Sequence, residues 1–160
     1  MKDMIRAGLL ALVVLAAGAL PALAGEHGEH EGEGRIGMVK DPLVVKECGA
    51  CHMAFQPQFL PAESWTKIMS DLKNHFGGNA TLDEETAKKI TAYLTAHAAR
   101  RFPLKAGAEP PLRITELRWF KHEHGGRRSS SRMLKRHGAK TLADCKACHR
   151  GADKGYYDDD

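Results

Sequence analysis

The sequence lacks a strong excess of charge, a second long apolar run and any β-strand pattern of useful length. Its formal net charge is +4 over 160 residues, a mild balance that does not suggest a nucleic-acid-binding protein. Beyond the N-terminus, no apolar run reaches the roughly 20 residues of a membrane-spanning helix. We therefore expect a soluble mature chain without a membrane span, mainly α-helical and with long loops.

The one long apolar run lies at the N-terminus. It covers 14 residues, from Ala7 to Leu20, which is short for a membrane anchor. A charged segment precedes it, and the Ala-Leu-Ala sequence at 22–24 resembles a secretory cleavage site. We predict a signal peptide over residues 1–24. The acidic, histidine-containing residues 25–37 are predicted to form a flexible tail.

The sequence has only four cysteines, and all of them belong to two copies of one motif. Residues 48–52 and 145–149 both have the pattern Cys-x-x-Cys-His, which attaches c-type haem. On one helical turn the two thiols can reach the two vinyl groups of the porphyrin, and the histidine then lies under the iron. The predicted thioether cysteines are Cys48, Cys51, Cys145 and Cys148, and the predicted proximal iron ligands are His52 and His149.

Other interpretations of these cysteines fit less well. A zinc site normally brings its two halves within roughly 15 to 20 residues, whereas 93 residues separate Cys51 from Cys145. A thioredoxin-like motif needs a β-α-β context, and neither motif has a strand-like flank. Two disulfides are compatible with an exported chain. With 9 histidines in 160 residues, however, a histidine would follow both pairs by chance in roughly 0.3% of cases, so haem attachment is favoured.

The chain is short for a protein that has to bury two haems. Without a 24-residue signal peptide, 136 of the 160 residues remain, or about 68 per haem, which is too few for a large apolar core. We therefore expect the haems to form the core and the chain without haem to be largely unfolded.

Apolar spacing predicts helices around the motifs. One is expected over 43–51, and another begins at Pro61 and carries an apolar stripe to Phe76. Thr81 and Glu84 have the spacing of a capping box, which predicts the start of a third helix. A further helix is expected over 115–124.

The sixth iron ligands decide between electron carriage and substrate chemistry. Methionine fits poorly, because Met53 adjoins His52 and Met69 belongs to the predicted apolar stripe. His75 lies three residues after Leu72 and shares that buried face, so we predict it as a distal ligand. His97 has similar spacing in the next helix and is the alternative.

The second motif has three candidate distal ligands. His124 falls four residues after Phe120, on the apolar face of its predicted helix, and is favoured over His122 and His137. Two histidines on each iron would leave no open coordination site. Without a methionine ligand, both haems are expected to be low-spin and of low potential.

Several segments resemble the bacterial dihaem cytochrome c family called DHC. The resemblance runs from about Met38 to the end. It implies a periplasmic electron carrier with two bis-histidine haems, supporting His52, His75, His124 and His149 as ligands. The quoted segments are Glu47–Met53, Leu60–Trp65, Asn74–Gly77, Asn79–Ala80, Arg113–Glu116, Trp119–Phe120, His124, Cys145–Ala152 and Tyr157–Asp159.

The resemblance also implies the organisation and the partners. Residues 38–102 would form a reduced, cytochrome c-like first haem domain, and residues 103–160 a less regular second haem domain. Family members can receive electrons from a membrane cytochrome b and pass them to a small oxygen-binding monohaem cytochrome c. The resemblance leaves the role of the acidic tail open.

Three functions stay open at this point. The first is an electron-transfer protein that is not an enzyme, the second is a redox subunit of a larger periplasmic reductase, and the third is a small haem enzyme with one open iron. The basic segment 127–140 and the acidic C-terminus could orient the protein on partners, or they could be solvated surface.

Overall fold

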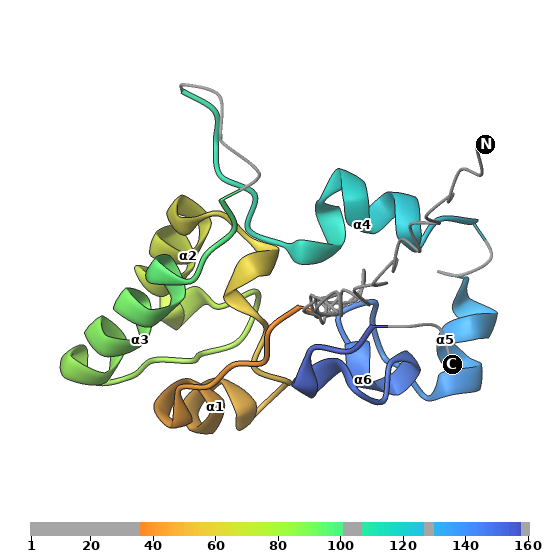
Figure 1. Cartoon of the computed structure of the whole chain (residues 1–160), viewed down its shortest axis with the longest axis horizontal. Coiled ribbons are helices and arrows are strands. Elements are labelled where there is room, and N and C mark those ends of the chain that lie inside the picture. The colour runs from red at the N-terminus through yellow and green to blue at the C-terminus, as the bar shows by residue number, and fades with distance from the viewer. Residues whose placement is uncertain (1–35, 101–106, 127–129, 158–160) are drawn as a thin grey trace, which may run out of the picture. The chain divides into compact units, whose positions relative to one another are not determined.

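Helices joined by long loops make up the described part of the chain (Figure 1). The computed structural model describes residues 36–100, 107–126 and 130–157, which contain no β-sheet. The predicted signal peptide and most of the predicted tail lie outside these ranges. The helices are α1 Pro42–Gly49, α2 Ala62–Met69, α3 Glu84–Ala96, α4 Arg118–Glu123, α5 Ser131–His137 and α6 Cys145–Cys148, with 3₁₀ turns at Pro57–Phe59, Leu72–Asn74, Ile114–Glu116 and Ala152–Lys154. The expectation of a mainly helical fold is confirmed.

The first motif begins in α1, whose start is fixed by its cap. Oδ1 of Asp41 accepts hydrogen bonds from the backbone N–H groups of Leu43 and Val44, at 2.8 and 3.1 Å, and a proline occupies the first turn. The helix ends at Gly49, two residues before the predicted end at 51. Cys48 therefore lies in the helix, while Cys51 and His52 lie in the turn that follows.

The described core is small and lies where α2 and α3 run side by side (Figure 1). Trp65 on α2 packs with Ile90 and Leu94 on α3, and Leu60 closes the cluster. The indole N–H of Trp65 donates to the carbonyl of Pro57 at 2.8 Å, so its one polar group is satisfied although the ring is buried. This pair of helices is the support for the first motif.

The predicted helix from Pro61 to Phe76 is wrong in its second half. α2 ends at Met69, and residues 72–74 form a separate 3₁₀ turn. Ser70 Oγ donates to the carbonyl of Lys67 at 2.8 Å, and Asn74 Nδ2 donates to Asp71 Oδ1 at 2.8 Å. Such local side-chain bonds compete with helical ones and end the helix. His75 therefore lies in a loop rather than on a helix face.

The predicted capping box is wrong by two residues. α3 is capped by Asp83, whose Oδ1 accepts a hydrogen bond from the backbone N–H of Thr86 at 2.9 Å. Thr81 instead donates to Asn79 Oδ1, through both its backbone N–H and its hydroxyl. The helix itself is present and ends before Arg100, as predicted.

Hydrogen bonds join the segments that precede and follow residues 101–106, which are called the linker below. The buried Gln56 donates from Nε2 to the carbonyl of Ala152 at 2.7 Å, and its Oε1 accepts from the Tyr157 hydroxyl at 2.6 Å. The backbone N–H of Ile36 donates to the carbonyl of Gly155 at 3.0 Å. Gly155 has a φ of +84°, and a Cβ there would lie 1.6 Å from the Ile36 carbonyl oxygen, so this contact requires glycine.

The helix α5 was not predicted from the sequence. The Ser130 hydroxyl caps its start, and Gly138 ends it with a φ of +67°.

None of the helices in the three described ranges is long and apolar enough to cross a membrane.

Candidate haem sites

His52 and His75 face each other across the first motif. Their ring centroids are 6.1 Å apart and their planes differ by 12°. A metal–imidazole bond is about 2 Å long, and a ring nitrogen lies about 1 Å from its ring centre, so two imidazoles on one metal have centroids about 6 Å apart. The separation of these two rings therefore matches that of two imidazoles on one iron.

Each ring of this first pair is suited to binding a metal as neutral imidazole. Nδ1 of His52 lies 2.7 Å from the Met53 carbonyl, which accepts its proton and leaves Nε2 available as a ligand. Partial burial lowers the pKa of His75, and the neighbouring His52 lowers it further. A lowered pKa keeps His75 neutral, as ligation requires.

His124 and His149 form a second pair with the same separation. Their centroids are 6.0 Å apart, but their planes differ by 82°. Nδ1 of His124 donates to the Phe120 carbonyl at 3.1 Å, and its ring stacks on the Phe120 ring with centroids 3.9 Å apart. Nδ1 of His149 is buried and has no hydrogen-bond partner among the described residues. The separation of the second pair therefore also matches that of two imidazoles on one metal ion.

A largely apolar cavity of about 530 Å³ adjoins the first pair, within the size range of ligand pockets. Its wall includes Cys48, Cys51 and both histidines of the first pair, with Trp65 and Leu94 from the core. The cavity continues to residues 141–145, and thus to the first cysteine of the second motif. One continuous space therefore connects the two motifs.

None of the four cysteines forms a disulfide. Burial raises the pKa of Cys48, and the negative charge of Glu47 raises it further. Burial also raises the pKa of Cys145 to about 11. Each motif thus offers two cysteine side chains and a histidine, with the ring of a second histidine about 6 Å from the first. This set of donors fits a c-type haem at both motifs.

The sequence matches the family described as Dihaem cytochrome c over residues 44–157. The chain belongs to the dihaem cytochrome c family. Accordingly, it carries two c-type haems, one on each Cys-x-x-Cys-His motif, and its role is electron transfer. The resemblance inferred from the sequence is thereby confirmed.

Solved structures of dihaem cytochromes resemble this cytochrome in fold and sequence. A crystal structure of DHC purified from Rhodobacter sphaeroides is 47% identical, with a TM-score of 0.64, and covers 74% of this chain and 98% of its own. A second Rhodobacter sphaeroides dihaem cytochrome c structure is 44% identical, with a TM-score of 0.67 and coverages of 76% and 99%. The sb-DHC of Shewanella baltica is 35% identical, with a TM-score of 0.60 and coverages of 76% and 89%. None of the curated proteins matches.

The alternative distal ligands, which all belong to the described residues, make no ring contact with either motif histidine. Nδ1 of His97 donates to the Tyr93 carbonyl at 2.8 Å, and the histidine is exposed. His122 is exposed and pairs with Glu123 at 2.9 Å. His137 is exposed at the end of α5. Of the candidates weighed from the sequence, the structure brings His75 and His124 to the motif histidines; their role as ligands stays a prediction.

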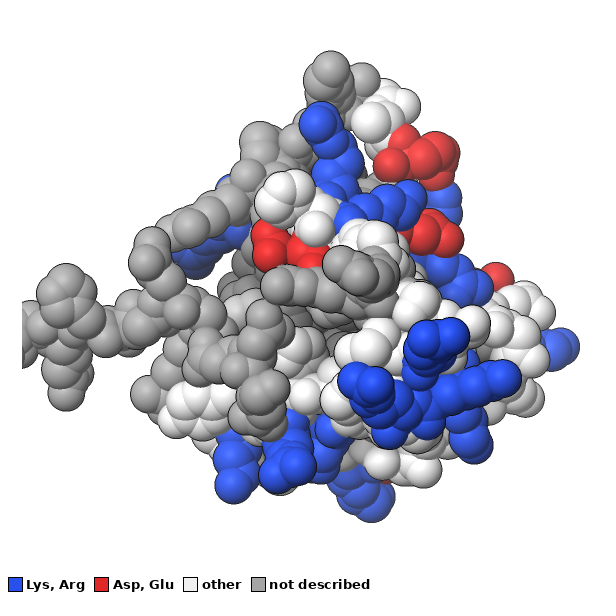
Figure 2. Space-filling model, turned by 90° about the vertical axis from the view of Figure 1, so that its right-hand side faces the viewer, with Lys and Arg blue, Asp and Glu red and all other residues white. Residues whose placement is uncertain are grey.

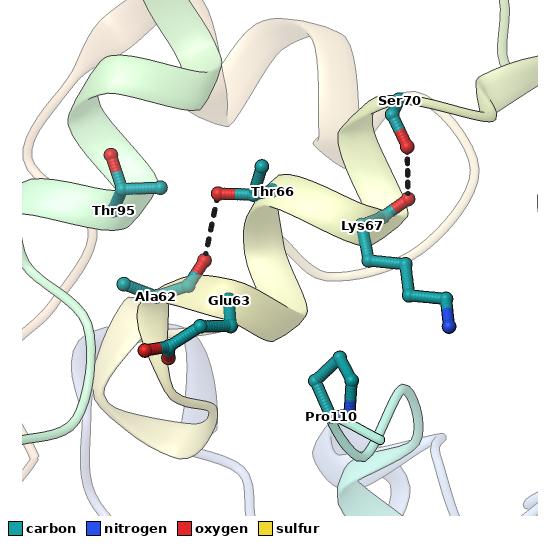
Figure 3. Close-up of a pocket in the computed structure, with 7 residues that line it drawn as sticks. All are labelled: Ala62, Glu63, Thr66, Lys67, Ser70, Thr95 and Pro110. Atoms are coloured by element: carbon teal, nitrogen blue, oxygen red, sulfur yellow. Dashed lines mark hydrogen bonds between the residues drawn. The ribbon is translucent and has the colours of Figure 1, made fainter. Parts of the chain in front are cut away.

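A second hollow in the cytochrome surface contains none of the predicted site residues. It lies on α2, between Thr95 of α3 and Pro110 (Figure 3). Its Thr66 and Ser70 hydroxyls donate to carbonyls of their own helix, and Lys67 forms an ion pair with Glu109. These two hydroxyls and the Lys67 ammonium are therefore occupied by structural contacts.

Three residues near the sites were not predicted from the sequence to be site residues. Gln56 and Tyr157 link the two motifs, and the Tyr157 ring lies 5.6 Å from the His149 ring. Arg113 lies over the Phe76 ring, with its Cζ 4.4 Å from the ring centroid. These partners are 37 to 101 residues apart in sequence, so no local pattern could have indicated the contacts.

Proposed function

We propose that this dihaem cytochrome is an exported, periplasmic electron carrier in which both irons have two histidine ligands. The ligand pairs are His52 with His75 and His124 with His149. The observation that carries this proposal is the separation of about 6 Å in both pairs, which matches two imidazoles on one metal. When bound, each haem supplies an iron that takes up and releases one electron.

Two histidines per iron would fill the sixth coordination position of both irons. Oxygen, carbon monoxide or a substrate would then have no free position on either iron. The absence of a methionine ligand favours low potentials. This combination supports an electron carrier over an enzyme with an open iron, and it leaves substrate chemistry to the partner proteins.

The position of the motifs supports electron exchange between the haems. The cavity beside the first histidine pair extends to Cys145 of the second motif. Gln56, four residues after His52, is hydrogen-bonded to both Ala152 and Tyr157, which follow His149 by three and eight residues. Electrons would therefore enter at one haem and leave at the other, with the protein holding the two close together.

The basic surface around α5 favours a partner with an acidic face. Arg132, Lys135, Arg136 and Lys140 are all exposed, and their side chains form no ion pair with a described residue. Figure 2 shows Lys and Arg side chains gathered on the lower part of the face that carries α5, with most of the visible Asp and Glu side chains above them. Complementary charge of this kind speeds the encounter of redox proteins.

The proposed partners follow from the family. The donor is a membrane cytochrome b, and the acceptor is a small oxygen-binding monohaem cytochrome c. α5 leads directly into the second motif, which begins eight residues after it ends. We therefore expect the acidic partner to exchange electrons with the second haem.

A visible spectrum combined with carbon monoxide binding tests the proposal. The reduced protein should show only low-spin bands and should not bind carbon monoxide rapidly. High-spin bands, or rapid binding at either haem, would favour a haem enzyme with an open iron. Permanent co-purification with a larger reductase from native periplasm would instead favour a subunit role.

A further inference from the structure

The loop that carries His75 has an unusual backbone. Phe76, the next residue, has a φ of +53°, and it is the one non-glycine residue with positive φ among those described. Bulky residues rarely adopt this left-handed conformation, which persists only where surrounding contacts enforce it. Gly77 follows with a φ of +98°, and the Gly78 N–H donates to the His75 carbonyl at 3.0 Å. The direction of His75 therefore depends on a strained turn.

The contacts within this loop do not account for the strain. Phe76 is 43% exposed, so burial in the core does not hold its ring in place. The ring lies against His75, with centroids 4.9 Å apart and planes at 63°. A contact from outside the loop must stabilise Phe76 in this position.

Arg113 supplies that contact from the other side of the linker. Its guanidinium Cζ lies 4.4 Å from the Phe76 ring centroid, within the range of a cation–π interaction. Nε of Arg113 also lies 3.7 Å from Glu116 Oε1, which orients the group. The next residue, Ile114, packs against the core and anchors the backbone.

The resulting stack borders the first site. Arg113, Phe76 and His75 all line the same cavity as His52. The three side chains thus form a continuous series from the segment after the linker to the proposed distal ligand.

We propose that Arg113 is a positioning residue for the distal ligand of the first haem. Its guanidinium holds the Phe76 ring and so stabilises the left-handed turn that directs His75 towards His52. The inference rests on the proposed bis-histidine ligation. It adds that the ligation of the first haem depends on a residue from the second half of the chain.

Carbon monoxide binding by the reduced holoprotein tests this role, because the gas binds only when His75 leaves the iron. Arg113→Ala should raise the binding rate at the first haem about threefold, as expected for loss of a half-exposed cation–π contact. Arg113→Lys keeps the charge and should restore part of the wild-type behaviour, whereas Arg113→Gln should not. Arg118→Ala, which removes an exposed arginine five residues away, is the matched control and should bind as wild type.

A second variant keeps the test independent of folding defects. Phe76→Leu should raise the rate similarly, and the Arg113→Ala, Phe76→Leu double variant should show no further increase, because both changes remove one contact. Additive effects of the two changes, or wild-type binding by Arg113→Ala, would overturn the inference.

His75→Ala separates the inference from the proposed function. If His75→Ala allows carbon monoxide to bind rapidly at the first haem while Arg113→Ala and Phe76→Leu do not change the binding rate, the proposed His75 ligation is supported. The proposed role of Arg113 is then refuted. If His75→Ala itself leaves carbon monoxide binding unchanged, His75 is not a ligand and both proposals fall.

Discussion

The two histidine pairs have the same separation but are built differently. His124 lies at the end of α4, where its ring stacks on Phe120 and its Nδ1 bonds to the carbonyl of the same residue. His75 lies in a strained loop that contacts Arg113 through Phe76. The second distal histidine is therefore positioned by its own helical turn, and the first by a contact between distant segments. Each distal histidine lies at a similar distance along the sequence from its motif histidine, 23 and 25 residues, which conceals this difference.

The largest effect is expected from removing either distal histidine. His75→Ala and His124→Ala should each convert one haem to a high-spin form that binds carbon monoxide stoichiometrically, because the sixth coordination position becomes vacant. Absorption spectra of the reduced variants measure this directly. His122→Ala is the matched control for His124→Ala and should keep both haems low-spin. If His122→Ala creates the high-spin haem instead, the ligand of the second site is assigned wrongly.

A substitution at Gln56 tests the hydrogen-bonded connection between the two sites. Gln56→Leu leaves the Ala152 carbonyl and the Tyr157 hydroxyl without their partner. The loss should lower the free energy of unfolding by about 1–3 kcal/mol, measured by denaturant titration of the holoprotein. Gln58→Leu, at an exposed position, should change stability much less. Equal effects of the two substitutions would show that the buried link contributes little.

A smaller effect, on the rate of electron transfer, is expected from charge reversal on the basic surface of α5. Lys135→Glu with Arg136→Glu should slow oxidation of the reduced protein by the anionic oxidant hexacyanoferrate(III) severalfold at low ionic strength. Added salt should remove the difference. Lys40→Glu with Lys88→Glu, an equal charge change at exposed positions in the first half, is the control. A similar slowing in the control would mean that net charge matters and that the α5 surface has no special role.

The chemistry of the sites was more predictable from the sequence than their construction. The spacing of the two Cys-x-x-Cys-His motifs indicates haem attachment because the thiols and the histidine must reach one porphyrin. His75 was selected on a helical periodicity that the structure does not have, since α2 ends at Met69. The structure nevertheless brings its ring to His52, because the chain turns at Phe76.

Contacts between distant residues account for most of what the sequence did not predict. The partners of Arg113 and Gln56 are far away in the chain, and no periodic pattern relates them. α5 was treated only as a basic segment, because its apolar residues are too few to mark a helix. Its start depends on a cap at Ser130 and its end on Gly138 in a left-handed conformation. Whether residues 38–102 and 103–160 fold as separate haem domains stays a prediction.

Electron paramagnetic resonance of the oxidised protein tests the central claim most directly. Near-parallel imidazole planes on one iron give a rhombic low-spin signal, whereas near-perpendicular planes give a strongly anisotropic one. With planes 12° apart in the first pair and 82° apart in the second, we predict one signal of each kind in equal amounts. His75→Ala should remove the rhombic signal, and His124→Ala the other. A high-spin signal from either haem in the unaltered protein would contradict bis-histidine ligation.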